Sequence, residues 1–175
     1  MTRALTPIAS YADQPATPWA NGAGSTVELV SLDESAALTP GLPAWRLSIA
    51  SLERPAAFSA LPGMRRIFRP IGSDVVLDID GRRFALADGQ ACVFDGAAVT
   101  ELIRLPRPCH AVNLMITAAE AVVASAGCPP EPVLDGTFLL TLGQTRLGPG
   151  FTLLRADEPA PSGMTDHAGV PVLRF

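Results

Sequence analysis

The stretch from Asp74 to Leu86, which reads DVVLDIDGRRFAL, decides the fold class. Two runs of strand-forming residues, 74–79 and 82–86, are separated by the pair Asp80-Gly81. An Asp-Gly pair between such runs is typical of a β-hairpin, because the type I′ turn needs positive φ at both central residues. We therefore predict two antiparallel strands joined at Asp80-Gly81.

The same pattern continues along the whole chain. The 17 prolines and 15 glycines are spread over 175 residues and leave little room for long helices. Asp-Gly pairs recur at Asp88, Asp95 and Asp135. Between such turns lie further runs of strand character, at 26–32, 45–50, 66–71, 91–94, 99–103, 111–117, 137–142, 151–154 and 170–174. Short strands with frequent turns are typical of a sandwich or barrel, so we predict an all-β fold.

One stretch, residues 118–126, fits two structures. Its alanines and Glu120 favour a helix, whereas Val122, Val123 and the short length fit a strand that continues from Asn113 equally well. Both alternatives stay open. The length of the chain fits one hydrophobic core, and no linker divides it, so we predict a single domain over residues 1–175.

The composition excludes several function classes. Hydrophobic residues make up 48% and charged residues 17%, which is the balance of a globular chain. The net charge of −4 does not attract nucleic acid or an anionic membrane. No run approaches the ~18 apolar residues that span a bilayer, and residues 1–13 do not resemble a signal peptide. We expect a cytoplasmic protein. All 13 basic residues are arginines, which rules out Schiff-base chemistry on lysine.

The cysteines and histidines are too few and too scattered to predict a metal or catalytic centre. Cys92, Cys109 and Cys128 are far apart and are interpreted as buried free thiols. A cupin metal site needs closely spaced histidines followed by a glutamate and a later histidine, whereas this chain has only His110 and His167. We predict no metal and no cofactor. Nucleophile-elbow and nucleotide-binding motifs are also missing, so no catalytic residue is assigned.

The segment from Pro18 to Leu29, PWANGAGSTVEL, concentrates polar and glycine residues before a strand. The glycines permit an irregular backbone and the close approach of another group. The strand that follows places Thr26 and Glu28 on one face. Composition alone fits two interpretations. The segment is either a turn into an edge strand, with Trp19 in the core and Glu28 in solvent, or one wall of a polar pocket.

The run 45–50 alternates between apolar and polar residues. Arg46 and Ser48 share one face, and the opposite face carries Trp45, Leu47 and Ile49. Arg46 and Ser48 therefore face either solvent or a lined cavity. An ion pair between Arg46 and Glu28 that joins two strands is the simpler alternative to a role in ligand binding.

Two further polar positions stand out. Arg65 and Arg66 point to opposite faces if both lie in a strand, so we expect one in solvent and the other inside the barrel. An inward arginine offers a planar fork that matches a carboxylate. Asn113 lies within an apolar strand and, once buried, needs hydrogen-bond partners from the protein or from a ligand.

These segments, in this order, resemble the HutD/Ves family of bacterial proteins. The matching pieces lie between residues 18 and 117: PWxNGxGxTxE from Pro18, WRLSxA from Trp45, FSxxPGxxR from Phe58, Asp80-Gly81, Phe94-Asp95-Gly96 and Asn113-Leu114-Met115. The resemblance implies a metal-free, cupin-type (RmlC-like) β-sandwich with two cupin halves in one compact chain. It also implies a small carboxylate ligand, formylglutamate or a related intermediate, and a regulatory role in histidine utilisation or stress response.

The resemblance also implies a set of pocket residues. Carried over position by position, they are Trp19, Asn21, Thr26, Glu28, Arg46, Ser48, Arg66 and Asn113. Arg66 is the residue that we expect to bind the ligand carboxylate, with asparagine and serine donors beside it.

Three functions remain open at this point. The first is a non-catalytic binder of a small-molecule carboxylate. The second is a metal-free cupin enzyme, an isomerase or hydrolase that uses Glu28 as acid or base. The third is a structural role or the binding of a protein partner. We expect neither nucleic acid nor membrane as a partner, and a homodimer is compatible with the sequence but is not determined by it.

Overall fold

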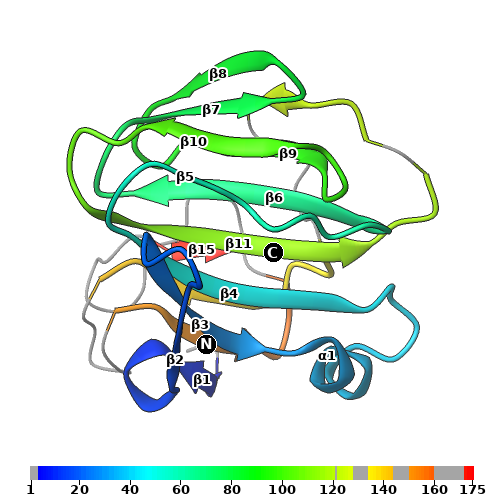
Figure 1. The fold of residues 1–175 in the computed structure, drawn as a ribbon. Coiled ribbons are helices and arrows are strands. Elements are labelled where there is room, and N and C mark those ends of the chain that lie inside the picture. The colour runs from blue at the N-terminus through cyan, green and yellow to red at the C-terminus, as the bar shows by residue number, and fades with distance from the viewer. Residues whose placement is uncertain (1–3, 121, 128–133, 144–149, 160–171) are drawn as a thin grey trace. The chain divides into compact units, whose positions relative to one another are not determined.

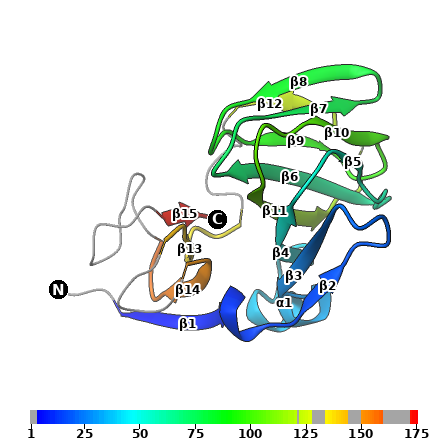
Figure 2. The same cartoon turned by 60° about the vertical axis from the view of Figure 1, so that its left-hand side comes forward.

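The computed structural model describes residues 4–120, 122–127, 134–143, 150–159 and 172–175. The chain divides into two compact units. The central unit is Ala16–Pro129, and the terminal unit combines Met1–Pro15 with Pro130–Phe175. Both units are built on antiparallel β-sheet, as Figures 1 and 2 show, and the predicted all-β fold is confirmed. The prediction of a single domain over residues 1–175 stays a prediction.

The central unit contains a seven-stranded sheet in the order β12-β9-β6-β11-β4-β3-β2. All neighbouring pairs in this sheet are antiparallel. Its strands are β2 (Ala16–Pro18), β3 (Gly24–Val30), β4 (Trp45–Leu52), β6 (Met64–Ile71), β9 (Cys92–Asp95), β11 (Cys109–Thr117) and β12 (Ser125–Ala126). Strands β4, β6 and β11 are the longest and form its middle, which Figure 1 shows.

A four-stranded sheet completes the central unit. Its order is β5-β10-β7-β8, with β5 (Ala56–Ala57), β7 (Val75–Ile79), β8 (Arg82–Leu86) and β10 (Thr100–Arg104). The hairpin between β7 and β8 is the one predicted from Asp80-Gly81. Both turn residues have positive φ, 50° for Asp80 and 79° for Gly81, and Ile79 pairs with Arg82. The type I′ prediction is confirmed.

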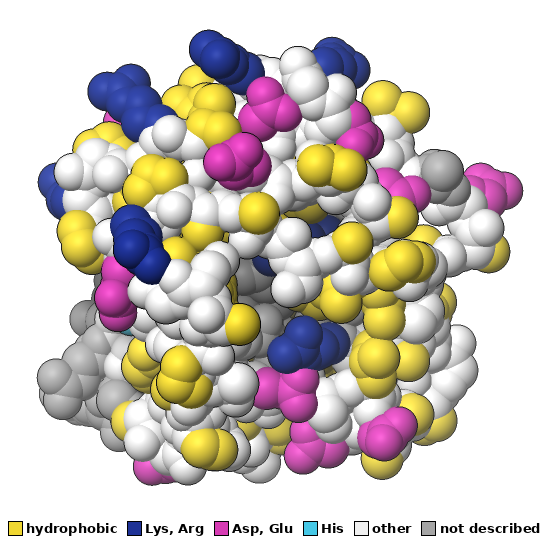
Figure 3. All heavy atoms as spheres, viewed as in Figure 1, with side chains coloured by type: hydrophobic (Ala, Val, Ile, Leu, Met, Phe, Trp, Pro, Cys, Tyr) yellow, Lys and Arg dark blue, Asp and Glu magenta, His cyan; other side chains and the backbone are white. Residues whose placement is uncertain are grey.

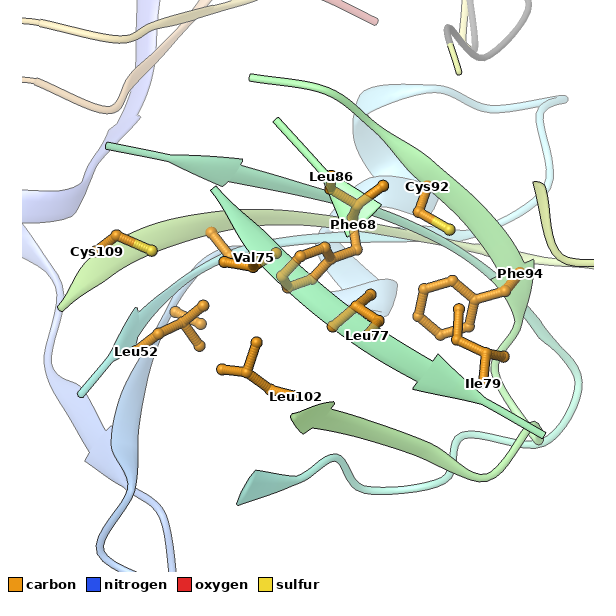
Figure 4. Close-up of a cluster of buried hydrophobic side chains, with 12 residues drawn as sticks. Leu52, Phe68, Val75, Leu77, Ile79, Leu86, Cys92, Phe94, Leu102 and Cys109 are labelled. Carbon is orange, nitrogen blue, oxygen red and sulfur yellow. The ribbon is translucent and has the colours of Figure 1, made fainter. Parts of the chain in front are cut away.

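The core of the central unit is an apolar cluster to which both of its sheets contribute. Phe68 and Phe94 enter it from the seven-stranded sheet, and Leu77 and Leu102 enter it from the four-stranded sheet. Figure 4 shows these side chains converging on one another. The central unit is therefore a β-sandwich, and the face of each sheet that carries these residues is its inner face. Burial of large apolar side chains on both inner faces stabilises this arrangement.

The helix α1 (Leu32–Leu38) was not predicted, and the strand predicted over 26–32 ends at Val30. A capping box begins the helix. The amide of Glu34 donates to Ser31 Oγ at 3.2 Å, and the amide of Ser31 donates to Glu34 Oε2 at 2.8 Å. The Ser-x-x-Glu spacing at 31–34 is the sequence pattern that indicates this helix. Within the described residues, no helix is both long and apolar enough to cross a membrane.

Removing the helix cap is expected to weaken the fold measurably. The change Ser31→Ala is expected to lower the free energy of unfolding by about 1 kcal/mol, because one amide at the start of α1 loses its acceptor. The backbone and side-chain hydrogen bonds from Ser31 hold the pKa of Glu34 below its usual value, so the same change raises that pKa. Urea unfolding measures the first effect. Ser125→Ala, at an exposed serine in β12, is the control, and equal losses in both variants contradict the role of the cap.

The stretch 118–126 is neither of the two structures that the sequence left open. Strand β11 ends at Thr117, and among the described residues of this stretch only Ser125 and Ala126 form a strand, β12, which pairs with β9. The predictions of a helix and of a continuing strand are therefore both wrong. The amide of Ala118 donates to the carbonyl of Gly63, and the amide of Val122 donates to Asp95 Oδ2. These tertiary contacts direct the backbone and override the helix propensity of the alanines.

The terminal unit holds a four-stranded sheet in the order β1-β14-β13-β15. Its strands are β1 (Leu5–Ser10), β13 (Phe138–Thr141), β14 (Thr152–Ala156) and β15 (Val172–Arg174). Figure 2 shows these strands beside one another. Leu139 and Leu154 are its buried cluster, with Leu5 and Val172 packed against them. The strands predicted near 137–142 and 151–154 are confirmed, as is the described part of the strand predicted at 170–174.

Candidate functional site

The strand register places several of the predicted polar residues on the inner face of the seven-stranded sheet. One row of paired residues, across β4, β11 and β6, consists of Arg46, Met115 and Arg66. The next row, across β3, β4, β11 and β6, consists of Glu28, Ser48, Asn113 and Phe68. Residues that are directly opposite in an antiparallel pair share one face of the sheet. Phe68 belongs to the core between the sheets. The two rows lie two residues apart along each strand, so the side chains of both rows face inward.

Arg66 is the buried cation of this face, with 8% of its surface exposed. Its Nε and Nη2 both donate to Asn113 Oδ1, at 3.0 and 2.9 Å. Its guanidinium carbon lies 4.6 Å from the ring centre of Phe58 and 5.7 Å from that of Phe94, within the range of cation–π attraction. Burial, with a contribution from the charge of Arg46, lowers the pKa of Arg66 to about 10. Arg66 therefore stays a cation at neutral pH.

No carboxylate balances this charge within the part of the chain that the structure describes. The hydrogen-bond acceptor of Arg66 is the neutral amide of Asn113, and its Nη1 donates to no described residue. A buried cation without a counter-ion is unfavourable, because the protein interior replaces the water that would solvate it. The arrangement therefore leaves one edge of a buried guanidinium available to an anion.

Two neutral polar residues lie on the same face: Asn113, which Arg66 contacts directly, and Ser48, which pairs with Asn113. Ser48 is 1% exposed and Asn113 is 3% exposed, and the two residues are directly paired between β4 and β11. Neither Ser48 Oγ nor Asn113 Nδ2 has a hydrogen-bond partner among the described residues. Buried polar groups are usually satisfied by protein, water or ligand. Together with Arg66 they are three largely buried residues whose remaining donors have no acceptor among the described residues, and we name them the donor cluster.

Arg46 and Glu28 form an ion pair beside the donor cluster. Arg46 Nε donates to Glu28 Oε2, and the two side chains are 29% and 42% exposed. Figure 3, in the orientation of Figure 1, shows a hollow in the surface with basic and acidic side chains side by side at its edge. The ion pair that the sequence offered as the simpler alternative is therefore present. It lies on the inner face of the sheet, next to the donor cluster.

Trp19 and Thr26 support the aromatic side of the site. Trp19 Nε1 donates to Thr26 Oγ1 at 2.8 Å, which joins the turn before β3 to that strand. The indole of Trp19 packs edge-on against Phe58, with 6.3 Å between ring centres. Phe58 in turn contacts Arg66. Trp19 therefore positions the Phe58 ring, and it is Phe58 rather than Trp19 that contacts the guanidinium.

Asn21 lies in the exposed turn that precedes β3, and the structure does not bring it together with the donor cluster. Its Oδ1 accepts from the amide of Ala23 at 2.9 Å, and its carbonyl accepts from Arg54 Nη2. A Cβ atom on Gly24 would lie 2.1 Å from the carbonyl oxygen of Ser51 on β4. The close approach predicted for the glycines of this segment is therefore confirmed at Gly24, where the start of β3 lies against the backbone of β4.

Two site residues, Phe58 and Phe94, were not predicted. Both occur in the motifs of the family resemblance, but they are separated by 36 residues and nothing in their spacing indicates that they flank one arginine. The amide of Phe58 donates to the carbonyl of Thr100 at 2.9 Å, which anchors this ring to the four-stranded sheet. Arg65 lies on the opposite face of β6 and is half-buried, so the expectation that it lies in solvent is only partly met.

No cysteine or histidine of the described residues belongs to the donor cluster. Cys92 and Cys109 are buried free thiols, as predicted, and burial raises the pKa of Cys92 to about 11. Burial lowers the pKa of His110. Cys128 and His167 lie outside the described residues. Among the residues that are described, no group of three histidine, cysteine or carboxylate side chains is placed to hold a metal ion.

The fold and the site define a β-sandwich protein with a buried cationic site. A family model described as HutD matches residues 11–128. The chain belongs to the HutD family, as the sequence motifs predicted.

Relatives with known sequences or structures agree with this assignment. An uncharacterised 21.2 kDa protein from the hutC 3′ region of Pseudomonas putida is 41% identical over 78 residues, which is 45% of this chain and 36% of that protein. The match thus spans about a third of that relative. The structure of HutD from Pseudomonas fluorescens SBW25, from a formate condition, is 22% identical with a TM-score of 0.62, covering 99% of this chain and 91% of that one.

A conserved protein of unknown function from Pseudomonas aeruginosa PAO1 is similar to the same degree. It is 23% identical with a TM-score of 0.62, and the match covers 91% of this chain and 88% of that chain. At such identities the two solved structures establish the shared fold and carry no information on the ligand.

Proposed function

We propose that this HutD-family protein binds a small carboxylate on the inner face of its seven-stranded sheet and catalyses no reaction. The donor cluster carries the proposal. Arg66, Ser48 and Asn113 are each more than nine-tenths buried, and their free donors face no acceptor from the described residues. A carboxylate supplies both the negative charge and the acceptor oxygens that such a cluster lacks.

The geometry of Arg66 favours a planar anion. Asn113 Oδ1 accepts from Nε and Nη2, so the edge that contains Nη1 is the one left for the ligand. Two aromatic rings contact the guanidinium and hold the fork in place. A fixed fork loses less side-chain entropy on binding, which raises affinity for a planar carboxylate above that for a spherical anion.

Formylglutamate, or a related intermediate of histidine degradation, is the ligand that we infer. The family assignment to HutD and the hutC-region relative support this class of compound. Formylglutamate has carboxylates for Arg66 and a formyl oxygen that Ser48 or the Asn113 amide can bind. We further infer a cytoplasmic, regulatory role in histidine utilisation or in a stress response, in which the protein senses the ligand.

The alternative of an enzyme that uses Glu28 has less support. Glu28 accepts a hydrogen bond from Arg46 Nε, and the two rows of the site contain no second carboxylate or histidine to complete an acid–base pair. A purely structural role also has less support, because buried polar groups that only hold strands together have protein partners. Ser48 has none among the described residues.

Calorimetry on the purified protein tests the proposal. Formylglutamate, urocanate and glutamate are titrated separately, and at least one is expected to bind with one ligand per chain. The matched control is the amide of the ligand that binds, with each carboxylate replaced by a carboxamide. It is expected to bind at least about tenfold more weakly, because hydrogen bonds to charged groups contribute about 1.5–3 kcal/mol. Failure of all three acids, or equal affinity for acid and amide, contradicts the proposal.

A further inference from the structure

Arg46, a second cation on the inner face beside the donor cluster, already forms an ion pair with the carboxylate of Glu28. We propose that Glu28 is a specificity-determining residue that competes with the second acidic group of a ligand for Arg46. This inference rests on the proposed binding of a carboxylate at Arg66. It assigns to Glu28 a role in selecting between ligands with one and two negative charges.

The register places the two cations within reach of one ligand. Arg46 and Arg66 occupy one row of the sheet, on either side of Met115 in β11. Strands two apart are separated by roughly 10 Å, and both side chains extend from the same face. The Arg46 charge contributes to the lowered pKa of Arg66, which agrees with this proximity. A diacid with a short carbon chain can therefore place one carboxylate at each guanidinium.

The charges of the three side chains decide which ligand fits. Arg46 and Arg66 are cations and Glu28 is an anion, so the site has one uncompensated positive charge. A monocarboxylate at Arg66 neutralises the site and leaves the Arg46–Glu28 pair intact. A dicarboxylate brings its second charge to Arg46, where it meets Glu28. Repulsion between the two carboxylates therefore opposes the second charge as long as Glu28 is present.

Glu28 is placed so that a ligand can displace it at low cost. Its side chain is 42% exposed, so the released carboxylate is hydrated again. Ion pairs at this degree of exposure contribute little net stability and are replaced readily. Among the described residues, the guanidinium of Arg46 makes one further contact, which is weak, with Nη1 4.0 Å from the sulfur of Met115. Its remaining donors are thus available to a ligand.

The test compares glutarate, a five-carbon diacid, with pentanoate, a five-carbon monoacid, by calorimetry on the wild type and on Glu28→Gln. Glu28→Gln is expected to raise the affinity for glutarate about fivefold, which corresponds to the loss of one half-exposed ion pair, and to change the affinity for pentanoate less than twofold. Glu101→Gln is the matched control. Glu101 is exposed on β10, next to the inward Leu102, and its loss changes the net charge equally.

A second variant checks that Arg46 receives the second carboxylate. In the Glu28→Gln background, Arg46→Ala is expected to abolish the gain in glutarate affinity, while pentanoate still binds. Glutarate affinity that is unchanged or lower in Glu28→Gln overturns the inference, and so does an equal increase for both acids. If the wild type binds neither of these acids and none of formylglutamate, urocanate and glutamate, the proposed function itself fails; if it binds one of those three but neither glutarate nor pentanoate, the role of Glu28 fails. If the wild type binds both and the ratio does not respond to residue 28, only the role of Glu28 fails.

Discussion

Arg66→Ala is expected to weaken the binding of formylglutamate, or of whichever pathway acid binds, by about 100-fold. The change removes the only buried cation of the donor cluster and the fork that two aromatic rings hold in place. Hydrogen bonds to charged groups contribute about 1.5–3 kcal/mol, so the loss of a charged fork corresponds to roughly this factor. Asn113 Oδ1 also loses both of its donors, which leaves the cluster less ordered. Calorimetry under the conditions used for the wild type measures the change.

Arg65→Ala is the matched control for this prediction. Arg65 precedes Arg66 in β6, faces the opposite side of the sheet and carries the same charge, so its removal is expected to change affinity less than threefold. Arg66→Lys keeps the charge but loses the planar fork, and an intermediate loss of about tenfold is expected. Affinity of Arg66→Ala within threefold of the wild type would show that the ligand does not bind at this arginine.

Phe68→Ala is expected to lower the free energy of unfolding by about 4 kcal/mol. Phe68 is fully buried in the core of the central unit, and its ring lies 5.5 Å from that of Phe58. Truncation of a buried phenylalanine removes apolar contacts and leaves a cavity, which typically costs about 3–5 kcal/mol. Because Phe58 loses its neighbour, the aromatic contact with Arg66 loosens as well. Urea unfolding followed by circular dichroism measures the stability.

Phe84→Ala is the control for the core substitution. Phe84 is half-buried on β8 and packs against the same cluster from the four-stranded sheet. Since part of its ring already faces water, its loss is expected to cost about 1–2 kcal/mol. Equal destabilisation by the two variants contradicts the position of Phe68 at the centre of the core.

The strands of the central unit were predictable because their determinants are local. The turn at Asp80-Gly81 needs only two residues that accept positive φ. The alternation from Trp45 to Ile49 correctly places Trp45, Leu47 and Ile49 on one face and Arg46 and Ser48 on the other, because strand side chains alternate whatever the strand packs against. The helix α1 was also predictable from the local sequence, since its capping box involves only residues 31–34.

Other features depend on parts of the chain that are distant in sequence. The stretch 118–126 has the composition of a helix, but hydrogen bonds to Gly63 and to Asp95 direct its backbone. Phe58 and Phe94 meet Arg66 because the two sheets of the sandwich pack together, and neither residue is a sequence neighbour of the arginine. Such contacts follow from tertiary packing, which cannot be predicted from the local propensities of the residues.

The all-β class, membership of the HutD family, most strand positions and a set of polar residues on alternating faces were predictable from the amino-acid sequence. The structure was needed to show that Arg66 is the inward arginine, that Asn113 is its acceptor across 47 residues, and that Glu28 pairs with Arg46. Alternation within a strand is local, whereas the face that becomes buried and the register between distant strands are decided by the pairing and packing of the whole sheet.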